Sequence, residues 1–146
     1  MIGQQQKDQA EKWFKDLRDK ICEEFEILEE DHLKLAPKSD AVAKKFERKS
    51  TIRETDDKED GGGGVMATLK GGRIFEKVGV NVSAVYGNLA PEAQKSITAR
   101  KAIPELKDDP RFWASGISLV AHMRNPHTPA IHLNTRMFWT PHAWWF

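Results

Sequence analysis

Side chains that can bind an anion and move protons are concentrated in two short runs of this 146-residue chain. The polar members of both runs stand at even positions, and they are Ser118, His122, Arg124, His132, Asn134 and Arg136. A guanidinium can hold a carboxylate through two parallel hydrogen bonds, and serine and asparagine can add neutral donors. A histidine near neutral pH can take up or release a proton. These residue types predict binding of an anionic ligand and acid–base chemistry on it.

The odd positions of the same runs are apolar, which predicts the element that positions the polar set. They are Ile117, Leu119, Ala121, Met123, Ile131, Leu133 and Met137, with Thr135 as the one polar exception. Successive side chains of a β-strand point to opposite faces of the sheet, so this alternation predicts two strands. One face of each strand is expected to be polar and the other to belong to the core.

A turn is expected between the two strands, in the segment 125–129, because it contains an asparagine and two prolines. The segment predicts a β-hairpin with Arg124 facing Ala130. In that register His122 lies opposite His132, and Ser118 lies opposite Arg136. A slip of one residue would mix the two faces, so the apolar pattern opposes that error.

The first 60 residues predict helices followed by a polar connection. From about Gln4 to Leu28, apolar residues recur at spacings of three and four, which is typical of an amphipathic helix. Pro37 interrupts the chain before a second predicted helix near Asp40 to Arg48. The almost wholly polar segment 49–60 is expected to be an exposed connection.

The remaining residues predict strands and one short helix. Gly61–Gly64 lacks the residues that close a phosphate-binding loop, so we interpret it as a flexible lead-in to the sheet that lies over a ligand. Strands are predicted at 65–69 and 74–85, a short helix at 91–98, and a loop with helical character at 103–109. We expect one incomplete domain, 1–146, with a helical part at 1–60 and a sheet at 61–146. The apolar end, Trp144 to Phe146, suggests a chain cut inside a strand.

Composition favours a cytoplasmic protein without a membrane span or a nucleic-acid partner. No apolar run is long enough for a transmembrane helix, and the N-terminus lacks the features of a secretory signal. Cys22 is the only cysteine, which excludes an internal disulfide and a cysteine-rich zinc site. Residues 1–60 hold 13 Lys and Arg against 17 Asp and Glu, whereas residues 61–146 hold 10 against 5. The basic second part suits an anionic ligand, although ordinary scatter of surface charge is the competing interpretation.

Five sequence motifs in order carry a resemblance to a known family. They are GGGG at 61–64, FEKVGVNVSAVYG at 75–87, ASGISLVAHMRNP at 114–126, HLNTR at 132–136 and WWF at 144–146. Together they resemble the oxygen-dependent coproporphyrinogen III oxidases of haem biosynthesis. The resemblance implies an α+β fold with a large antiparallel sheet flanked by helices, assembled as a homodimer. It also implies oxidative decarboxylation of two propionates of coproporphyrinogen III to vinyl groups, which gives protoporphyrinogen IX.

The resemblance further implies cofactors and residue roles. Molecular oxygen is the expected co-substrate, no organic cofactor is expected, and a divalent metal is used by some members of the family only. His132 corresponds to the family's proton donor, and His122 to a metal ligand that His132 would join. The expected substrate contacts are Ser118, Asn134, Thr135 and Arg136. In the family a functional aspartate follows the WWF motif, so we expect weak or no turnover from these 146 residues alone.

Two other functions remain open at this point. The first is metal-assisted chemistry at His122 and His132, which metal analysis and chelation would distinguish. The second is a non-catalytic module that binds an anionic tetrapyrrole or dimerises. An oxygen-dependent assay would separate catalysis from binding alone.

Overall fold

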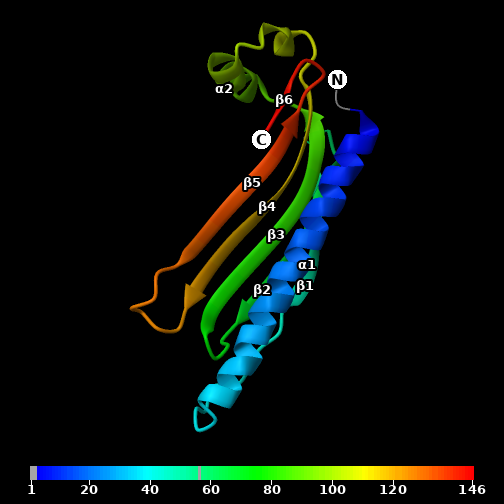
Figure 1. Ribbon diagram of the computed structural model, residues 1–146. Coiled ribbons are helices and arrows are strands. Elements are labelled where there is room, and N and C mark those ends of the chain that lie inside the picture. The colour runs from blue at the N-terminus through cyan, green and yellow to red at the C-terminus, as the bar shows by residue number, and fades with distance from the viewer. Residues whose placement is uncertain (1–2, 56) are drawn as a thin grey trace.

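A six-stranded antiparallel sheet forms the body of the protein, seen in a computed structural model that describes residues 3–55 and 57–146 (Figure 1). The strand order is β1-β2-β3-β4-β5-β6, so each strand pairs only with its neighbours in the chain. The strands are β1 Glu47–Glu54, β2 Asp60–Lys70, β3 Phe75–Asn88, β4 Arg111–Met123, β5 Ile131–Trp139 and β6 Trp144–Trp145. With its helices, the sheet confirms the predicted α+β class.

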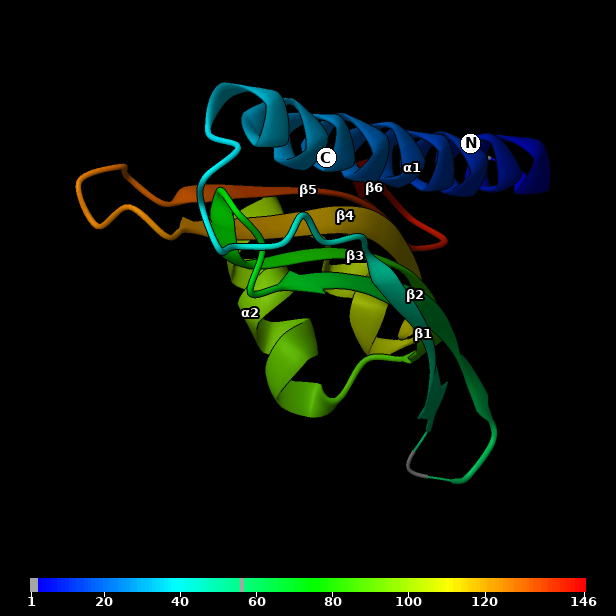
Figure 2. The same ribbon diagram turned by 90° about the horizontal axis from the view of Figure 1, so that it is seen from below.

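A single long helix, α1 (Gln4–Leu35), covers one face of the sheet (Figures 1 and 2). The helix begins at the predicted residue but extends seven residues beyond Leu28. Phe14 and Cys22 are buried on its inner side, and Phe25 stacks on Phe75 with ring centroids 4.7 Å apart. Burial of this apolar stripe, and not helix propensity alone, holds α1 on the sheet.

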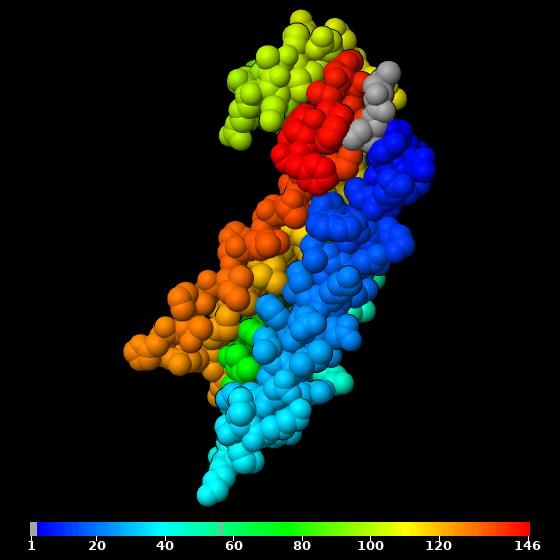
Figure 3. All heavy atoms as spheres, in the orientation of Figure 1, coloured from blue at the N-terminus to red at the C-terminus, as the bar shows by residue number. Residues whose placement is uncertain are grey.

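The core lies between α1 and the central strands, as the alternation predicts. Val78, Val80 and Val82 of β3 are buried on this face, together with Ile117 and Leu119 of β4. β5 is less well covered, because the exposed fractions of Ile131 and Leu133 are both 44%. Figure 3 shows the ridge of α1 atoms, with the atoms of the β4–β5 hairpin beside it and not beneath it. The predicted core face is therefore confirmed for β4, whereas on β5 the side chains of Ile131 and Leu133 are partly exposed to solvent.

Two short helices, α2 (Pro91–Lys101) and η1 (Pro104–Lys107), lie on the other side of the sheet from α1 (Figure 2). α2 starts at Pro91, where proline fits the first helical turn, and ends at Lys101, followed by the capping residue Ala102 in the left-handed region. This confirms a helix at 91–98, with three further residues. The predicted helical character at 103–109 is also confirmed by η1.

The segment 36–60 differs from its prediction. No helix forms near Asp40 to Arg48, and the first half of the expected polar connection, residues 49–54, belongs to the edge strand β1. Every side chain of β1 is exposed, so the strand carries no apolar alternation from which it could be predicted. Gly61–Gly64 is likewise not a lead-in, because all four residues lie inside β2 and three of them pair with β3 at positions 83–85. The prediction that these glycines lie over a ligand remains untested.

A buried carboxylate fastens α1 to the turn between β2 and β3. Glu29 is fully buried, and its oxygens accept hydrogen bonds from the backbone N–H groups of Arg73 at 2.5 Å, Ile74 at 2.8 Å and Phe75 at 3.0 Å. The Arg73 side chain is also buried and donates to backbone carbonyls of the segment 36–41. These contacts position the end of β2 and the start of β3.

Neither α1 nor the shorter helices of the described residues combine the length and apolar character that a membrane crossing requires. The assignment to a single incomplete domain and the cytoplasmic location stay predictions.

Candidate functional site

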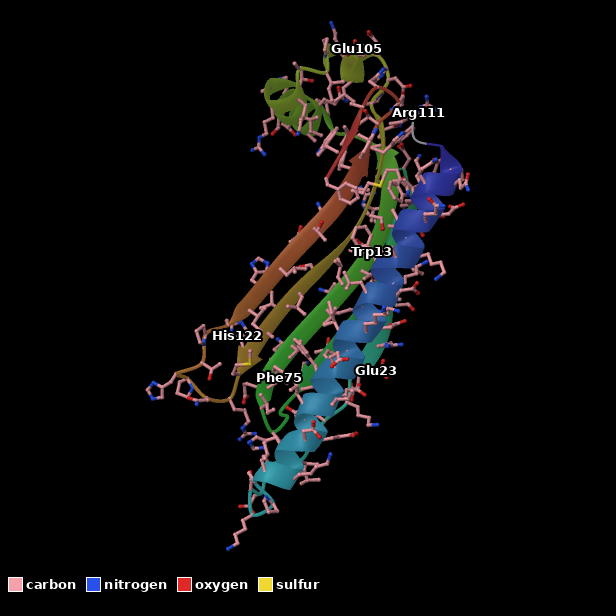
Figure 4. All side chains as sticks on the ribbon, viewed as in Figure 1. Trp13, Glu23, Phe75, Glu105, Arg111 and His122 are labelled. Carbon is pink, nitrogen blue, oxygen red and sulfur yellow. The ribbon has the colours of Figure 1, made fainter. Side chains whose placement is uncertain are left out.

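The predicted polar residues share the face of the sheet that α1 leaves open. Ser118 and His122 of β4 point away from the buried Ile117 and Leu119. On β5, the open face carries His132, Asn134, Arg136 and Phe138 at alternate positions. His122 and Arg111 mark opposite ends of β4 (Figure 4). The structure therefore brings Ser118, His122, His132, Asn134 and Arg136 onto one surface, called here the open face.

The pairing register of the hairpin differs from the predicted register by two residues. Ser118 lies opposite Asn134 and Val120 lies opposite His132, so neither the His122–His132 pair nor the Ser118–Arg136 pair forms. A shift of two residues keeps every side chain on its face, so parity could not exclude it. The unpaired segment 124–130 is correspondingly longer than the turn predicted at 125–129. The correction places a serine and an asparagine side by side, one on each strand.

Thr135 is separated from the other predicted substrate contacts. As an odd member of β5 it faces the α1 side, where it lines a cavity with Trp13 and Phe14. It also lines the neighbouring cavity that contains Asn134 and Arg136. Its role as a substrate contact stays a prediction, and its side chain points to the other side of the sheet.

A cavity of about 430 Å³ lies between α2 and the open face of β5. Its lining residues are Ile97, Asn134, Thr135, Arg136, Phe138, Trp145 and Phe146. It has the size of a small-molecule site and combines apolar walls with two polar side chains, a composition typical of such sites. His132, Ser118 and His122 are not among the lining residues. We refer to this space as the β5 cavity.

Two aromatic rings that line the β5 cavity, those of Phe138 and Trp145, belong to a row of three stacked rings that the sequence did not predict. Phe138 stacks on Phe112 on one side, with centroids 5.6 Å apart, and on Trp145 on the other, at 4.8 Å. Cations stand at both ends: the Arg53 guanidinium lies 5.7 Å from the Phe112 ring centre, and the Lys101 ammonium 5.5 Å from that of Trp145. One feature of the sequence could have indicated the row: Phe112 and Phe138 stand at even positions, as the polar site residues do, and so are expected on the same face of the sheet.

Arg136 differs from most other arginines of the chain in having no protein partner among residues 3–55 and 57–146. Hydrogen bonds or ion pairs engage Arg18, Arg48, Arg53, Arg73, Arg111 and Arg124. Arg100, on the surface of α2, is the other arginine without such a partner in the described part of the chain. An exposed guanidinium at the rim of a cavity, with all its donors free, can bind a carboxylate or phosphate in two-pronged fashion.

Arg124, one of the even-position polar residues, has a structural partner. Its guanidinium donates to the Gly72 carbonyl at 3.1 Å, and its backbone N–H donates to the Ile74 carbonyl at 2.8 Å. It therefore fastens the end of β4 to the β2–β3 turn.

The two histidines remain a separate question. His132 and His122 are both exposed on the open face, at diagonal positions of neighbouring strands. Among the residues that the structure describes, no group of three histidine, cysteine, aspartate or glutamate side chains has metal-binding geometry. Two imidazoles without a third ligand make a poor metal site, since catalytic zinc usually has three protein ligands. The metal role of His122 and His132 stays a prediction.

Another cavity, of about 660 Å³, lies at the N-terminal end of α1, and several of the charged groups that line it already have partners. The Lys7 ammonium lies 3.4 Å from the ring centre of Trp139, and its pKa is lowered by desolvation and by nearby Arg111. Arg111 is itself paired with Asp109, at 2.6 Å. Because these side chains satisfy one another, this cavity offers a ligand less than the β5 cavity does.

Comparison with known proteins adds the family to this geometry. The family model described as coproporphyrinogen III oxidase matches residues 9–146. The chain is 42% identical over 138 residues to the oxygen-dependent coproporphyrinogen-III oxidase of Rickettsia felis, an alignment that covers 94% of the chain and 44% of that relative. The protein of the same description from Rickettsia bellii is 39% identical over 143 residues, with 98% of the chain and 46% of the relative covered.

The chain thus spans less than half the length of these curated relatives. The family match nevertheless extends over almost all of its own residues, including every strand of the sheet. The chain belongs to the coproporphyrinogen III oxidase family.

Proposed function

We propose that the open face of this chain binds coproporphyrinogen III and takes part in its oxygen-dependent oxidative decarboxylation to protoporphyrinogen IX. Family membership supports the reaction, and the open face supplies side chains suited to it. The observation that carries the proposal is the alignment of His132, Asn134 and Arg136 on one exposed strand face, with Ser118 opposite Asn134. A substrate with four carboxylates needs free cationic and neutral donors, and these side chains have no partner among residues 3–55 and 57–146.

The substrate-binding roles follow from the chemistry of each side chain. Arg136 would grip a propionate carboxylate through charge-assisted hydrogen bonds, which are about twice as strong as neutral ones. Ser118 and Asn134, on adjacent strands, would orient a second polar group by donating neutral hydrogen bonds. The open face needs no organic cofactor for this binding, and molecular oxygen enters as the co-substrate.

The reaction balances without a further reductant or oxidant. Each propionate loses its carboxylate as carbon dioxide and a hydrogen with two electrons from the carbon next to the pyrrole, which leaves a vinyl group. One molecule of oxygen accepts two electrons and two protons and becomes hydrogen peroxide. One of those protons derives from the substrate hydrogen, and we assign delivery of the other to His132, since an imidazole can supply it near neutral pH. The two propionates together release two molecules of carbon dioxide.

The decisive test follows carbon dioxide release and vinyl formation from coproporphyrinogen III in air and under anaerobic conditions. We expect the chain to bind the substrate anaerobically and to convert it slowly in air, below the rate of the Rickettsia felis relative, because it spans less than half of that protein. Replacing His132→Ala should abolish conversion while retaining binding. His127→Ala, in the exposed hairpin turn, is the matched control and should change neither.

Three outcomes would contradict the proposal or narrow it. Absence of both anaerobic binding and conversion would contradict it. Binding without conversion, unchanged by His132→Ala, would favour the alternative of a non-catalytic anionic-tetrapyrrole binder. Chelation that removes activity would favour the metal role of His122 and His132. Homodimer formation is a separate proposal that sedimentation equilibrium would test.

A further inference from the structure

We propose that the β5 cavity is a subsite for a pyrrole ring remote from the reacting propionate, with Phe138 and Trp145 as its floor and Arg136 as its carboxylate anchor. This inference rests on the proposed function, since it assigns one part of the same substrate to a place on the open face. Phe138 and Trp145 are positioning residues in this assignment. The reacting side chain would lie near His132, outside the cavity.

The separation along β5 supports two subsites. His132 and Arg136 are four residues apart on the same face, which corresponds to about 14 Å along an extended strand. Arg136 lines the β5 cavity, whereas His132 does not. A group held inside the cavity is therefore not the group that contacts His132. A macrocycle carrying several propionates can meet both places at once, with one carboxylate at each.

The arrangement of the aromatic rings determines how they can meet a pyrrole. Phe138 has Phe112 on one face and Trp145 on the other, with interplanar angles of 9° and 21°. Because both faces of Phe138 are covered, its edge is what it can present to a ligand. Aromatic edges carry partial positive charge and attract the electron-rich face of another π-system. A pyrrole is electron-rich, so it is suited to lie face-on over these ring edges.

The remaining walls favour a ring with an anionic side chain. Ile97 of α2 supplies an apolar contact across the cavity, and Asn134 supplies an amide beside Arg136. Lys101, at the last turn of the same helix, stands over the outer ring of the row and adds a second positive charge nearby. The volume of about 430 Å³ lies toward the small end for ligand sites, which suits one part of a tetrapyrrole better than the whole.

The test uses a monopyrrole that carries a single propionate, titrated into the ¹⁵N-labelled chain and followed by NMR. We expect saturable shifts of the Trp145 indole N–H and of the Arg136 side chain, with little change at the His132 imidazole. The Trp144 indole is an internal control, because Trp144 precedes Trp145 in the two-residue strand β6 and does not line the cavity. Shifts centred on His132, or no saturable shift at Trp145, would overturn the subsite.

Variants assign the shifts to contacts. Phe138→Leu and Trp145→Leu should each weaken monopyrrole binding about two- to tenfold, the range expected for one aromatic pair. Arg136→Ala should weaken it about ten- to a hundredfold. Trp144→Phe and Arg100→Ala are the matched controls and should leave it unchanged. Arg136 is exposed, so Arg136→Ala should leave the fold intact. Unchanged affinity in that variant would overturn the assignment even if Phe138→Leu or Trp145→Leu failed to fold.

The same experiment separates this inference from the proposed function. If the monopyrrole does not bind in the cavity but coproporphyrinogen III is converted in air, the subsite is wrong and the proposed function stands. If the monopyrrole binds as expected and no conversion occurs, the subsite stands on its own as an anionic-pyrrole site, and the catalytic proposal fails.

Discussion

Charged and polar side chains at two places on the sheet differ in burial and in hydrogen bonding. At the β2–β3 turn, Glu29 and Arg73 are buried, and backbone groups satisfy them. On the open face, His132, Asn134 and Arg136 are exposed, and in the described part of the chain no hydrogen-bond or ion-pair partner is found for them. Burying a charge is costly unless it is bonded, so the first set is committed to structure. The second set retains its full hydrogen-bonding capacity for a ligand.

The contrast also indicates what each set should do when it is altered. Removing a satisfied buried group leaves several backbone donors or acceptors without partners, which lowers the free energy of unfolding. Removing an exposed group without a partner should leave stability almost unchanged. Any loss caused by such a change then belongs to binding or chemistry.

The largest expected effect is at the buried carboxylate. Glu29→Ala should lower the free energy of unfolding by about 3–5 kcal/mol, because four backbone N–H groups, those of residues 44, 73, 74 and 75, lose their acceptor. Urea denaturation measures the change. Glu30→Ala is the control and should cost less than about 1 kcal/mol, because Glu30 is exposed and its only ion-pair partner among the residues that the structure describes is Lys45, at 3.7 Å. Equal effects of the two changes would remove the distinction between the two regions.

The next effect is on ligand binding at the open face. Arg136→Ala should weaken anaerobic binding of coproporphyrinogen III by about 2 kcal/mol, the worth of hydrogen bonds to a charged group. The free energy of unfolding should change by less than about 0.5 kcal/mol. Calorimetric titration and urea denaturation of the same variant measure the two quantities. Unchanged affinity would exclude Arg136 from substrate binding, and Arg136→Lys tests whether the two-pronged geometry is needed.

A glycine beside the site links stability to the placement of Arg136. A Cβ at Gly116 would stand 2.5 Å from the Thr135 carbonyl oxygen and 2.9 Å from the Arg136 Cα. Gly116→Ala should therefore lower the free energy of unfolding by about 1–2 kcal/mol and shift the backbone signals of β5. Gly79→Ala is the matched control, because a Cβ there meets nothing within 4 Å. A Gly116 variant as stable as the Gly79 variant would show that β4 and β5 do not approach so closely.

The smallest effect concerns an exposed pair that is engaged but not buried. A hydrogen bond from Arg111 lowers the pKa of Asp109 to about 2. A lowered carboxyl pKa means that the pair stabilises the fold above the ordinary carboxyl pKa and that this contribution disappears as the pH falls toward 2. Arg111→Ala should raise the pKa of Asp109 toward about 3.9, as carboxyl ¹³C NMR can measure. If the substitution left the pKa of Asp109 unchanged, the ion pair between Arg111 and Asp109 would be contradicted.

Sequence patterns predicted the faces of the hairpin well because side-chain period is a local property. Alternation from Ile117 to Met123 fixes which side chains are buried, whatever the partner strand. The register was wrong by two residues because such a shift leaves all faces intact, and only the length of the turn decides it. Thr135 was assigned to the site by resemblance, but it occupies an odd position of β5, so its side chain lies on the opposite face from the other site residues.

Other features had no pattern to predict them. β1 is an exposed edge strand rich in charge, a composition that protects a sheet edge but hides its strand character. The burial of Glu29 and Arg73 depends on backbone groups that the fold brings close, which residue types do not encode. The ring of Phe138 became a candidate only when β6 placed Trp145 against it. In each case the feature depends on contacts between residues distant in the sequence, which local periodicity does not encode.

The neighbour-only pairing of the strands has a consequence for how the protein assembles. Each hairpin can close as soon as its second strand exists, so the sheet can grow one strand at a time from β1 during synthesis. α1 emerges first but finds its main partners only in β3 and β4. The apolar stripe of α1 therefore stays exposed to solvent until β3 and β4 have been synthesised and can pack against it. β5, which carries His132, Asn134 and Arg136, joins the sheet after β3 and β4, so these open-face residues reach their places only once the centre of the sheet has formed.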